Sequence, residues 1–409
     1  RDGYVASLGD FDAQAIEVRY ALASGIFEQV AGLVRGRKIA FVIGPDLLDF
    51  PDGEPLLDAV INLALLTGSI GAPGAGIWVP SSENNLVGAM DMGMNPDYLP
   101  GRKKIHAKKE ATLIMKSGMS DLVAAMETGA LRAAFVMGEN PLRSLPQKDR
   151  VKAAFQNLEF LVVQDIVCNR TAELAHVILP GAAVFEKHGS FTNMEGRIQT
   201  FEPAVMPPGD AKADWEILAH LAKVMGYPEQ YEKIEKIRQE IRRTVPMYQG
   251  LGNHQQDGIR NSESDNPFLN DQAKFQFLPA KQAMPVSTDP SFPLFAKIRS
   301  PRFHLGSGTR TSRSARIKAY NGQGPVEISP ADCKGLGLAD DEQVRIASAA
   351  GALDRRLKQN RHLNPGQVII PSGVNGNDAM FLASLAGKED PVTFGSSFSR
   401  VRIEKISEN

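Results

Sequence analysis

Short apolar runs alternate with segments of helical periodicity through the first half of the chain. The run KIAFVIG at 38–44 predicts a buried strand, and apolar residues at helical spacing over 54–67 predict a helix that Gly68 ends. Strands joined by helices at this interval predict an α/β fold with doubly wound, largely parallel sheets, whose ligands bind outside the carboxyl ends of the strands. Further strands are predicted at 131–137, 158–163 and 176–179, with a helix at 121–128.

The second half of the chain differs in its composition and in the elements that it predicts. Asp210 is predicted to cap a helix that reaches about Met225, and apolar residues from Tyr231 to Ile241 predict an amphipathic helix that stops before Pro246. Residues 250–289 are rich in Asn, Gln, Ser, Asp, Pro and Gly and predict a linker. After Pro293, closely spaced β-rich runs predict a small antiparallel β-barrel or sandwich. Those runs lie at 324–328, 343–348 and 367–370.

Composition excludes several classes of protein. The 409 residues are 43% hydrophobic and 23% charged, as expected of a soluble globular chain with more than one core. With 46 basic and 47 acidic residues, the chain has no overall field that would hold a nucleic acid. No apolar run is long enough to span a membrane, and no signal peptide is recognisable, so we expect a cytoplasmic protein.

Two features of the composition bear on metal chemistry and on completeness. The chain has 2 cysteines, Cys168 and Cys333, which are too few for a four-cysteine iron-sulfur cluster or zinc site. Cys333 is predicted to lie in a turn. The chain begins at Arg1 instead of Met, so we expect a processed product, an expression product or a piece of a longer polypeptide. No serine-hydrolase elbow, histidine metal pair or complete G-x-G-x-x-G fingerprint is present, so we predict no catalytic or metal-ligating residue.

Polar residues follow two of the predicted strands. Gly138, Glu139 and Asn140 come directly after the strand at 131–137, where a carboxylate and an amide can bind a nucleotide base or ribose. A turn ended by Pro141 explains the same residues. Asp165 ends the next strand and suits a ribose or a guanine edge, although a simple helix cap would look identical.

Three loops offer further polar groups. The glycine-rich loop 68–76 suits a phosphate or a pterin-like ligand, or serves only as a connection between layers. Polar side chains are dense at 186–197 without a helical or strand period. In the loop 304–313 of the predicted β module, Arg310 or Arg313 could bind a diphosphate with its forked guanidinium.

Five ordered segments carry a resemblance to a known family. The segments are 62–77 (NLALLTGSIGAPGAGI), 83–101 (ENNLVGAMDMGMNPDYLPG), 135–142 (FVMGENPL), 160–199 (FLVVQDIVCNRTAELAHVILPGAAVFEKHGSFTNMEGRIQ) and 303–314 (FHLGSGTRTSRS). Together they resemble the molybdopterin oxidoreductase superfamily, and within it the C-terminal part of the large iron-sulfur subunit of proton-pumping NADH:quinone oxidoreductase, complex I. Large subunits of formate dehydrogenase are the alternative.

The resemblance implies how the chain is divided and where a cofactor would bind. It implies interleaved Rossmann-like domains followed by a C-terminal barrel of the molybdopterin-dinucleotide-binding kind. The domain boundaries are 1–91 and 92–225 for parts of two α/β domains, 226–292 for a helix and linker, and 293–409 for the barrel. The residues at cofactor-binding positions are Gly138, Glu139, Asn140, Asp165, Thr171, Gly306 and Thr309.

The resemblance also implies a function. We expect a structural fragment of an electron-transfer subunit, an oxidoreductase by family but inactive as this chain alone. Molybdopterin guanine dinucleotide is a possible cofactor, although we expect the chain alone to bind none, and iron-sulfur clusters are expected only in a preceding region. The expected partners are other subunits of a membrane-associated respiratory complex at the inner face of the cell membrane. The alternatives are the C-terminal part of a molybdopterin guanine dinucleotide-dependent formate dehydrogenase and a standalone small-molecule-binding protein.

Overall fold

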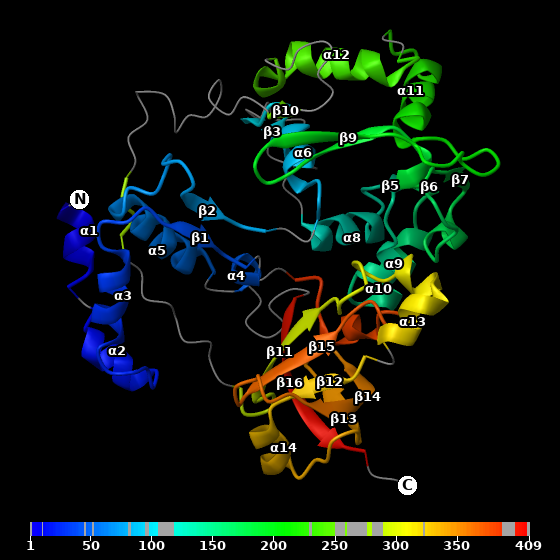
Figure 1. The fold of residues 1–409 in the computed structure, drawn as a ribbon. Helices are drawn as coiled ribbons and strands as arrows, with labels where there is room; N and C mark the ends of the chain where they lie inside the picture. The colour runs from blue at the N-terminus through cyan, green and yellow to red at the C-terminus, as the bar shows by residue number, and fades with distance from the viewer. Residues whose placement is uncertain are drawn as a thin grey trace. The chain divides into compact units, whose positions relative to one another are not determined.

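The computed structural model divides the chain into two compact units, each built from several chain segments (Figure 1). Unit 1 comprises Arg1–Ile105, Ser190–Thr200 and Ile237–Val286. Unit 2 comprises His106–Gly189, Phe201–Lys236 and Ser287–Asn409. The structure describes residues 2–9, 11–44, 46–50, 53–80, 83–94, 98–104, 118–228, 231–249, 258–259, 276–279, 289–321, 324–386 and 397–406.

Unit 1 begins with helices and a pair of parallel strands. The predicted helix at 54–67 is confirmed as α5 (Gly53–Leu66), and Gly68 follows it with a φ of 61°, the left-handed conformation typical of a helix end. Strands β1 (Ala40–Val42) and β2 (Gly76–Trp78) pair in parallel. The other elements are α1 (Asp2–Ser7), α2 (Ala13–Arg19), α3 (Ile26–Val34), α4 (Asp46–Asp49), α6 (Leu86–Asp91), β3 (Tyr98–Leu99) and β4 (Lys103–Lys104).

A small sheet and a buried ion pair organise the rest of unit 1. Strand β9 (Arg197–Phe201) lies between β8 (Gly189–Thr192) and β10 (Gly258–Ile259). The segment 186–197, which showed no period in the sequence, therefore contains β8 and the first residue of β9. The fully buried Asp91 pairs with Arg102 at 2.7 Å and accepts a hydrogen bond from the Tyr248 hydroxyl at 3.2 Å. The predicted linker at 250–289 falls mostly outside the described residues.

Unit 2 contains a parallel sheet. Its strands β5 (Ala133–Met137), β6 (Phe160–Asp165) and β7 (Val177–Pro180) lie in the order β5-β6-β7, and all pairings are parallel, as the sequence predicted. Helix α8 (Met119–Glu127) precedes β5 in the chain, and α9 (Pro141–Ser144) and α10 (Lys148–Gln156) connect β5 to β6. The central strand β6 contributes the buried Leu161 and Val163 to a core that includes Val123 and Val151. The most continuous apolar run of this region therefore forms the central strand of the sheet, as expected of a parallel sheet covered by helices.

The start of the next helix differs from its prediction. Helix α11 (Asp214–Val224) is preceded by Ala213 as its N-cap residue, so the prediction that Asp210 caps it was wrong. The side chain of Glu216 accepts a hydrogen bond from the Ala213 amide at 3.0 Å and satisfies a donor that the cap residue cannot satisfy itself. The amphipathic helix predicted to stop before Pro246 is confirmed as α12 (Ile234–Thr244).

The C-terminal part of unit 2 is a closed barrel of six strands. The prediction of a barrel is confirmed, but its description as antiparallel was wrong, because β11 pairs with β15 and β12 with β14 in parallel. Parallel neighbours need crossover connections, and helices lie between several of these strands in the chain. In barrel order the strands are β11 (Leu294–Arg299), β15 (Gln367–Pro371), β12 (Val326–Ile328), β14 (Ala352–Gln359), β13 (Gln343–Ala347) and β16 (Phe398–Lys405), and the helices are α13 (Ala315–Asn321) and α14 (Pro330–Leu336).

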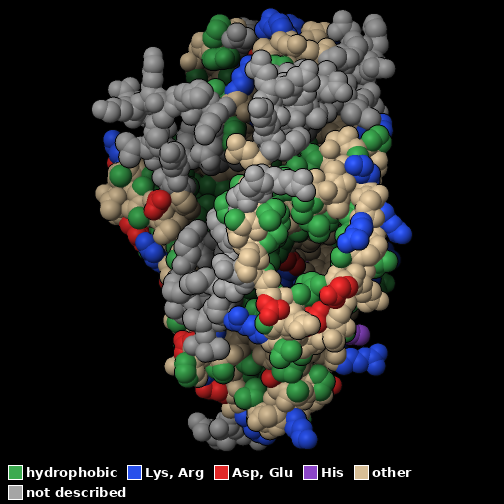
Figure 2. Space-filling model, turned by 90° about the vertical axis from the view of Figure 1, so that its left-hand side faces the viewer, with side chains coloured by type: hydrophobic (Ala, Val, Ile, Leu, Met, Phe, Trp, Pro, Cys, Tyr) green, Lys and Arg blue, Asp and Glu red, His purple; other side chains and the backbone are tan. Residues whose placement is uncertain are grey.

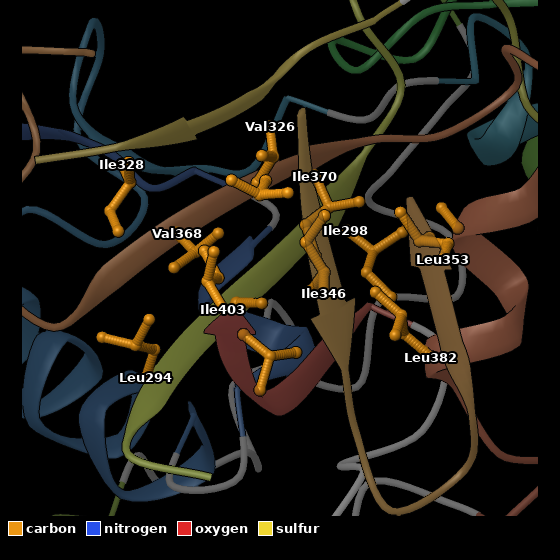
Figure 3. Packing of buried hydrophobic residues seen from close by; sticks show 14 of the residues in the cluster. Leu294, Ile298, Val326, Ile328, Ile346, Leu353, Val368, Ile370, Leu382 and Ile403 are labelled. Atoms are coloured by element: carbon orange, nitrogen blue, oxygen red, sulfur yellow. The ribbon is translucent and has the colours of Figure 1, made fainter. Parts of the chain in front are cut away.

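Alternation along the barrel strands builds its core. Figure 3 shows Ile298, Ile346 and Ile370 among the side chains that converge inside the barrel. Strand β14 alternates exposed and buried positions along most of its length, which is the pattern of a strand with one face in the core. Cys333 was predicted in a turn but lies buried in α14, where burial raises the pKa of its thiol.

The surface carries charges of both signs. On the face that Figure 2 shows, Lys and Arg side chains and Asp and Glu side chains are interspersed, with apolar side chains between them. This agrees with the near balance of 46 basic and 47 acidic residues. Among the described helices, none is both long enough and apolar enough to cross a bilayer.

Candidate functional site

The carboxyl ends of β5 and β6 bring two polar loops to one edge of the parallel sheet. Met137 at the end of β5 pairs with Gln164 near the end of β6, so residues 138–140 and 165–171 leave the sheet side by side. The backbone amide of Gly138 donates to the Gln164 carbonyl at 2.8 Å. This is the edge at which open α/β sheets bind ligands.

A chain of side-chain hydrogen bonds joins these loops to the barrel loop 304–313. The Asn140 amide donates from Nδ2 to Thr309 Oγ1 at 2.9 Å, and the Thr171 hydroxyl donates to Asn140 Oδ1 at 2.9 Å. Thr171 Oγ1 in turn accepts from the Leu142 amide at 3.2 Å. Because Asn140 is 3% exposed and Thr171 is fully buried, these bonds fix the position of the loops with little competition from water.

Asp165 is the acidic group of the edge. Its Oδ1 accepts from the Ile166 amide at 2.7 Å and from Nη2 of Arg310 at 3.2 Å. Its Oδ2 accepts from Nδ2 of Asn169 at 2.7 Å. The Asp165 side chain is only 3% exposed. Carboxylate oxygens removed from water in this way need hydrogen-bond donors, and these three donors meet that need.

Arginine side chains gather beside the loops, and we call Arg143, Arg170, Arg310 and Arg313 the arginine cluster. Arg143 donates to the carbonyls of Ser307 at 2.7 Å and Gly373 at 3.1 Å. Burial lowers the pKa of Arg143, and the charges of Arg170 and Arg313 lower it further. Arg313 donates to the Cys168 carbonyl.

Within the part of the chain that the structure describes, the arginine cluster has more positive charges than carboxylate partners. Among the ion pairs of the described residues, only Arg310 has a carboxylate partner, Asp165 at 3.2 Å. Arg143 and Arg313 are held by carbonyl groups, which orient a guanidinium but carry no net charge. An anion with several oxygen acceptors, such as a diphosphate, fits this surplus of charge and donors.

The structure brings together most of the sequence-predicted residues. Asn140, Thr171 and Thr309 form the hydrogen-bonded chain, and Arg310 joins the Gly138 carbonyl, at 2.8 Å, to Asp165. The two remaining predicted residues, Glu139 and Gly306, make other hydrogen bonds. Glu139 is exposed and its carboxylate accepts from the adjacent Asn140 amide at 2.7 Å, while the Gly306 carbonyl accepts from the Ser300 hydroxyl at 3.2 Å.

The sequence reasoning missed Arg143 and Asn169. Asn169 binds Asp165 and also accepts from the backbone amides of Thr171 and Ala172 at 2.9 and 3.0 Å, so it holds the whole loop after β6. Asn side chains often accept from backbone amides two residues on in loops, but this general preference does not set Asn169 above its neighbours. Arg143 gave no such signal, because its partners Ser307 and Gly373 are distant in sequence. Within the described residues, no group of His, Cys, Asp and Glu side chains is arranged to hold a metal ion.

Comparisons with known proteins agree with this geometry. Residues 17–224 match the family profile described as Molybdopterin oxidoreductase, and residues 296–398 match the Molydopterin dinucleotide binding domain. The chain is 32% identical to the F420-dependent formate dehydrogenase subunit alpha of Methanocaldococcus jannaschii over 84% of this chain and 54% of that protein. It is 30% identical to formate dehydrogenase H of Escherichia coli over 85% and 53%, respectively.

Two further comparisons concern a related reductase and the fold. The NADPH-Fe(3+) oxidoreductase subunit alpha of Geobacter sulfurreducens is 29% identical over 95% of this chain and 46% of that protein. The solved structure of acetylene hydratase from Pelobacter acetylenicus superimposes with a TM-score of 0.53 and 19% identity, over 79% of this chain and 51% of that chain. At that identity the superposition concerns the fold alone. The chain spans about half the length of the curated relatives it matches.

These findings revise the more detailed part of the sequence interpretation. The relatives include formate dehydrogenases, so they favour the alternative drawn from the sequence over the expected complex I subunit, which they do not specifically support. The broader resemblance is confirmed by the family profile, which spans half of the chain. The chain belongs to the molybdopterin oxidoreductase family.

Proposed function

We propose that this chain forms the dinucleotide-holding part of a formate dehydrogenase-type oxidoreductase, and that it binds the guanine dinucleotide portion of molybdopterin guanine dinucleotide. The observation that carries the proposal is the buried Asp165 beside the arginine cluster, at the edge where the parallel sheet meets the barrel loop. The match to formate dehydrogenase alpha subunits supports the choice of enzyme class. The match to the dinucleotide binding domain supports this choice of cofactor, in place of the expectation from the sequence that the chain alone binds none.

The residues present fit the chemistry of this group. A carboxylate can accept two hydrogen bonds from the ring N–H and the exocyclic amine of guanine, and Asp165 is held in place by Asn169 and by its own loop. Arg143, Arg310 and Arg313 offer the charge and the donors that a diphosphate needs. When bound, the metal carried by the pterin would accept the two electrons that leave formate.

The chain's own residues would bind and orient the cofactor. The hydrogen bonds that run from Thr309 through Asn140 to Thr171 keep the loops after β5 and β6 at a fixed distance from the barrel loop. A site with so little freedom loses little entropy when a ligand binds. We assign formate oxidation to a polypeptide of the relatives' length, and we expect no formate-dependent dye reduction from this chain alone. The alpha-subunit names of the relatives support the further proposal that partner subunits bind such a polypeptide.

Cofactor content tests the proposal directly. The chain is produced in a bacterial host that synthesises molybdopterin guanine dinucleotide, purified, and hydrolysed in acid, and the released GMP is quantified. We expect GMP to copurify with the chain and to fall about tenfold or more in Asp165→Asn, which loses a charge-assisted hydrogen-bond acceptor. The control is Asp354→Asn, which removes an exposed carboxylate paired with Arg345 on the barrel. Purified chain without GMP, or equal GMP in both variants, would refute the assignment.

A further inference from the structure

The ion pair between Arg310 and Asp165 is unequal in its exposure to solvent. The side chain of Asp165 is 3% exposed and that of Arg310 is 44% exposed. The other donors to the Asp165 carboxylate are the Ile166 amide and Asn169, and both belong to the loop that carries Asp165. Arg310 is therefore the only one of these partners that can leave the carboxylate without unfolding the loop after β6.

We infer that Arg310 makes entry to the Asp165 site depend on phosphate, so that the site admits a guanine nucleotide but discriminates against the unphosphorylated nucleoside. This inference rests on the proposed function, because it concerns the same site. A guanine base that bonds to Asp165 must compete with the guanidinium of Arg310. A ligand with a diphosphate offers that guanidinium a new acceptor, and a nucleoside offers it none.

The arginine cluster makes this exchange selective. Arg310 belongs to the same barrel loop as Ser307, whose carbonyl holds Arg143, and as Arg313. Burial lowers the pKa of Arg143, and the charges of Arg170 and Arg313 lower it further. Displacing Arg310 from Asp165 without an anion adds a further uncompensated cation beside this group. A diphosphate offsets that cost, because its negatively charged oxygens accept hydrogen bonds from guanidinium groups.

The other hydrogen bond of Arg310 among the described residues is exposed to water. Its Nη2 donates to the Gly138 carbonyl at 2.8 Å, and Gly138 is exposed. Water can replace Arg310 at that carbonyl at little cost. The hydrogen bonds of Asn140 with Thr309 and Thr171 do not involve Arg310, so they keep the barrel loop in place while the arginine side chain moves.

Titration of the purified chain with GDP and with guanosine tests the inference. For wild type we expect GDP to bind about tenfold or more tightly than guanosine, the value of about one charge-assisted hydrogen bond. In Arg310→Ala we expect guanosine to bind several-fold more tightly than it does to wild type and GDP to bind about tenfold more weakly, so the preference narrows or reverses. Arg345→Ala, which breaks an exposed ion pair of the same 3.2 Å length on the barrel, is the control and should change neither affinity.

The possible failures are distinguishable. If Arg310 acted only as a phosphate ligand, Arg310→Ala would weaken GDP and leave guanosine unchanged, which overturns the inference and keeps the proposed function. If Arg310 were only structural, both ligands would weaken together and the melting temperature would fall, which also overturns it. If neither ligand binds to wild type or to Arg310→Ala, the proposed function itself is wrong and the inference falls with it.

Discussion

The barrel core and the site at the carboxyl ends of β5 and β6, which we call the strand-end site, are both buried regions of unit 2. The barrel core is built from apolar side chains and the strand-end site from polar ones. The barrel interior is lined by aliphatic side chains such as Ile328, Ile346 and Leu357, each at most 1% exposed. The strand-end site buries Asn140, Asp165 and Thr171, which are polar. Apolar burial gains free energy from any close packing, whereas buried polar groups are tolerated only when each has a partner. We therefore attribute stability mainly to the barrel, and the proposed function places recognition at the strand ends.

The two regions also differ in how they depend on distant parts of the chain. Strand neighbours in the barrel hold each other through regular backbone ladders. The strand-end site needs individual side chains of the barrel loop, such as Thr309 and Arg310, to meet loops about 140 to 170 residues away. We therefore expect substitutions in the barrel to affect folding, and substitutions at the strand ends to affect binding with a smaller cost in stability.

The largest expected effect comes from opening a cavity in the barrel. Ile346→Ala removes a fully buried aliphatic side chain and should lower the free energy of unfolding by about 2–5 kcal/mol, measured by urea denaturation. Leu336→Ala on α14, where the side chain is 44% exposed, should cost less than about 1 kcal/mol. Equal losses in the two variants would show that the barrel core is not the source of stability.

The next largest loss of stability is expected where the loop that contains Gly308 closely approaches Gly373. Gly308 has a φ of 74°, and a Cβ added there would lie 2.1 Å from the Gly373 carbonyl oxygen. Gly308→Ala should therefore cost about 2–3 kcal/mol in thermal or chemical unfolding, from backbone strain together with steric overlap. Gly366→Ala is the matched control, because its φ is 85° but no atom lies within 4 Å of the added Cβ. It should show the strain alone, and an identical cost at both positions would rule out the close approach.

A smaller loss of stability is expected when the hydrogen bonds that join Thr309, Asn140 and Thr171 are removed. Asn140→Ala leaves the hydroxyls of Thr171 and Thr309 without their shared partner, and this should cost about 1–3 kcal/mol of unfolding free energy. The exposed Asn364→Ala should stay within about 0.5 kcal/mol of wild type. If Asn140→Ala were as stable as wild type, the chain of hydrogen bonds would not connect the sheet to the barrel in solution.

The smallest effect is a dependence of stability on pH. Burial lowers the pKa of His304 below 6.5, and the charge of Arg143 lowers it further. The unfolded chain therefore binds the proton more readily, so the contribution of neutral His304 is complete above pH 6.5 and is lost as the pH falls through its lower folded value. His304→Gln should reduce the loss of stability between pH 7.5 and 5.5. A variant with an unchanged pH profile would contradict this assignment.

Periodicity predicted elements well where burial followed from local sequence. The strand predicted over 158–163 and the helix predicted over 54–67 appear as β6 and α5. A short continuous apolar run is typical of a strand buried on both faces, and apolar residues at helical spacing are typical of a helix buried on one face. The barrel was predicted, but its parallel pairs were not, since pairing of β11 with β15 depends on chain segments about 70 residues apart. The cap of α11 was misplaced because Glu216, from within the helix, satisfies the Ala213 amide.

The site was predictable as far as its residues follow strands or belong to the polar loop 304–313, where Arg310 and Arg313 were named as phosphate ligands. Gly138, Asn140 and Asp165 could be named because the carboxyl ends of parallel strands meet at one edge. Asn169 and Arg143 could not be ranked above their neighbours, because their roles depend on where Asp165 and the Ser307 carbonyl lie in space. The resemblance to the superfamily supplied Gly306 and Thr309, which no local pattern links to the sheet.

The most direct test of the central claim compares GDP with ADP in calorimetric titrations of the wild-type chain and Asp165→Asn. A carboxylate accepts from the ring N–H and amine of guanine, whereas adenine presents a ring acceptor at the corresponding position. The account predicts saturable binding of GDP, ADP binding at least about tenfold weaker, and loss of this preference in Asp165→Asn. Equal binding of the two nucleotides to wild type, or an unchanged preference in the variant, would contradict it.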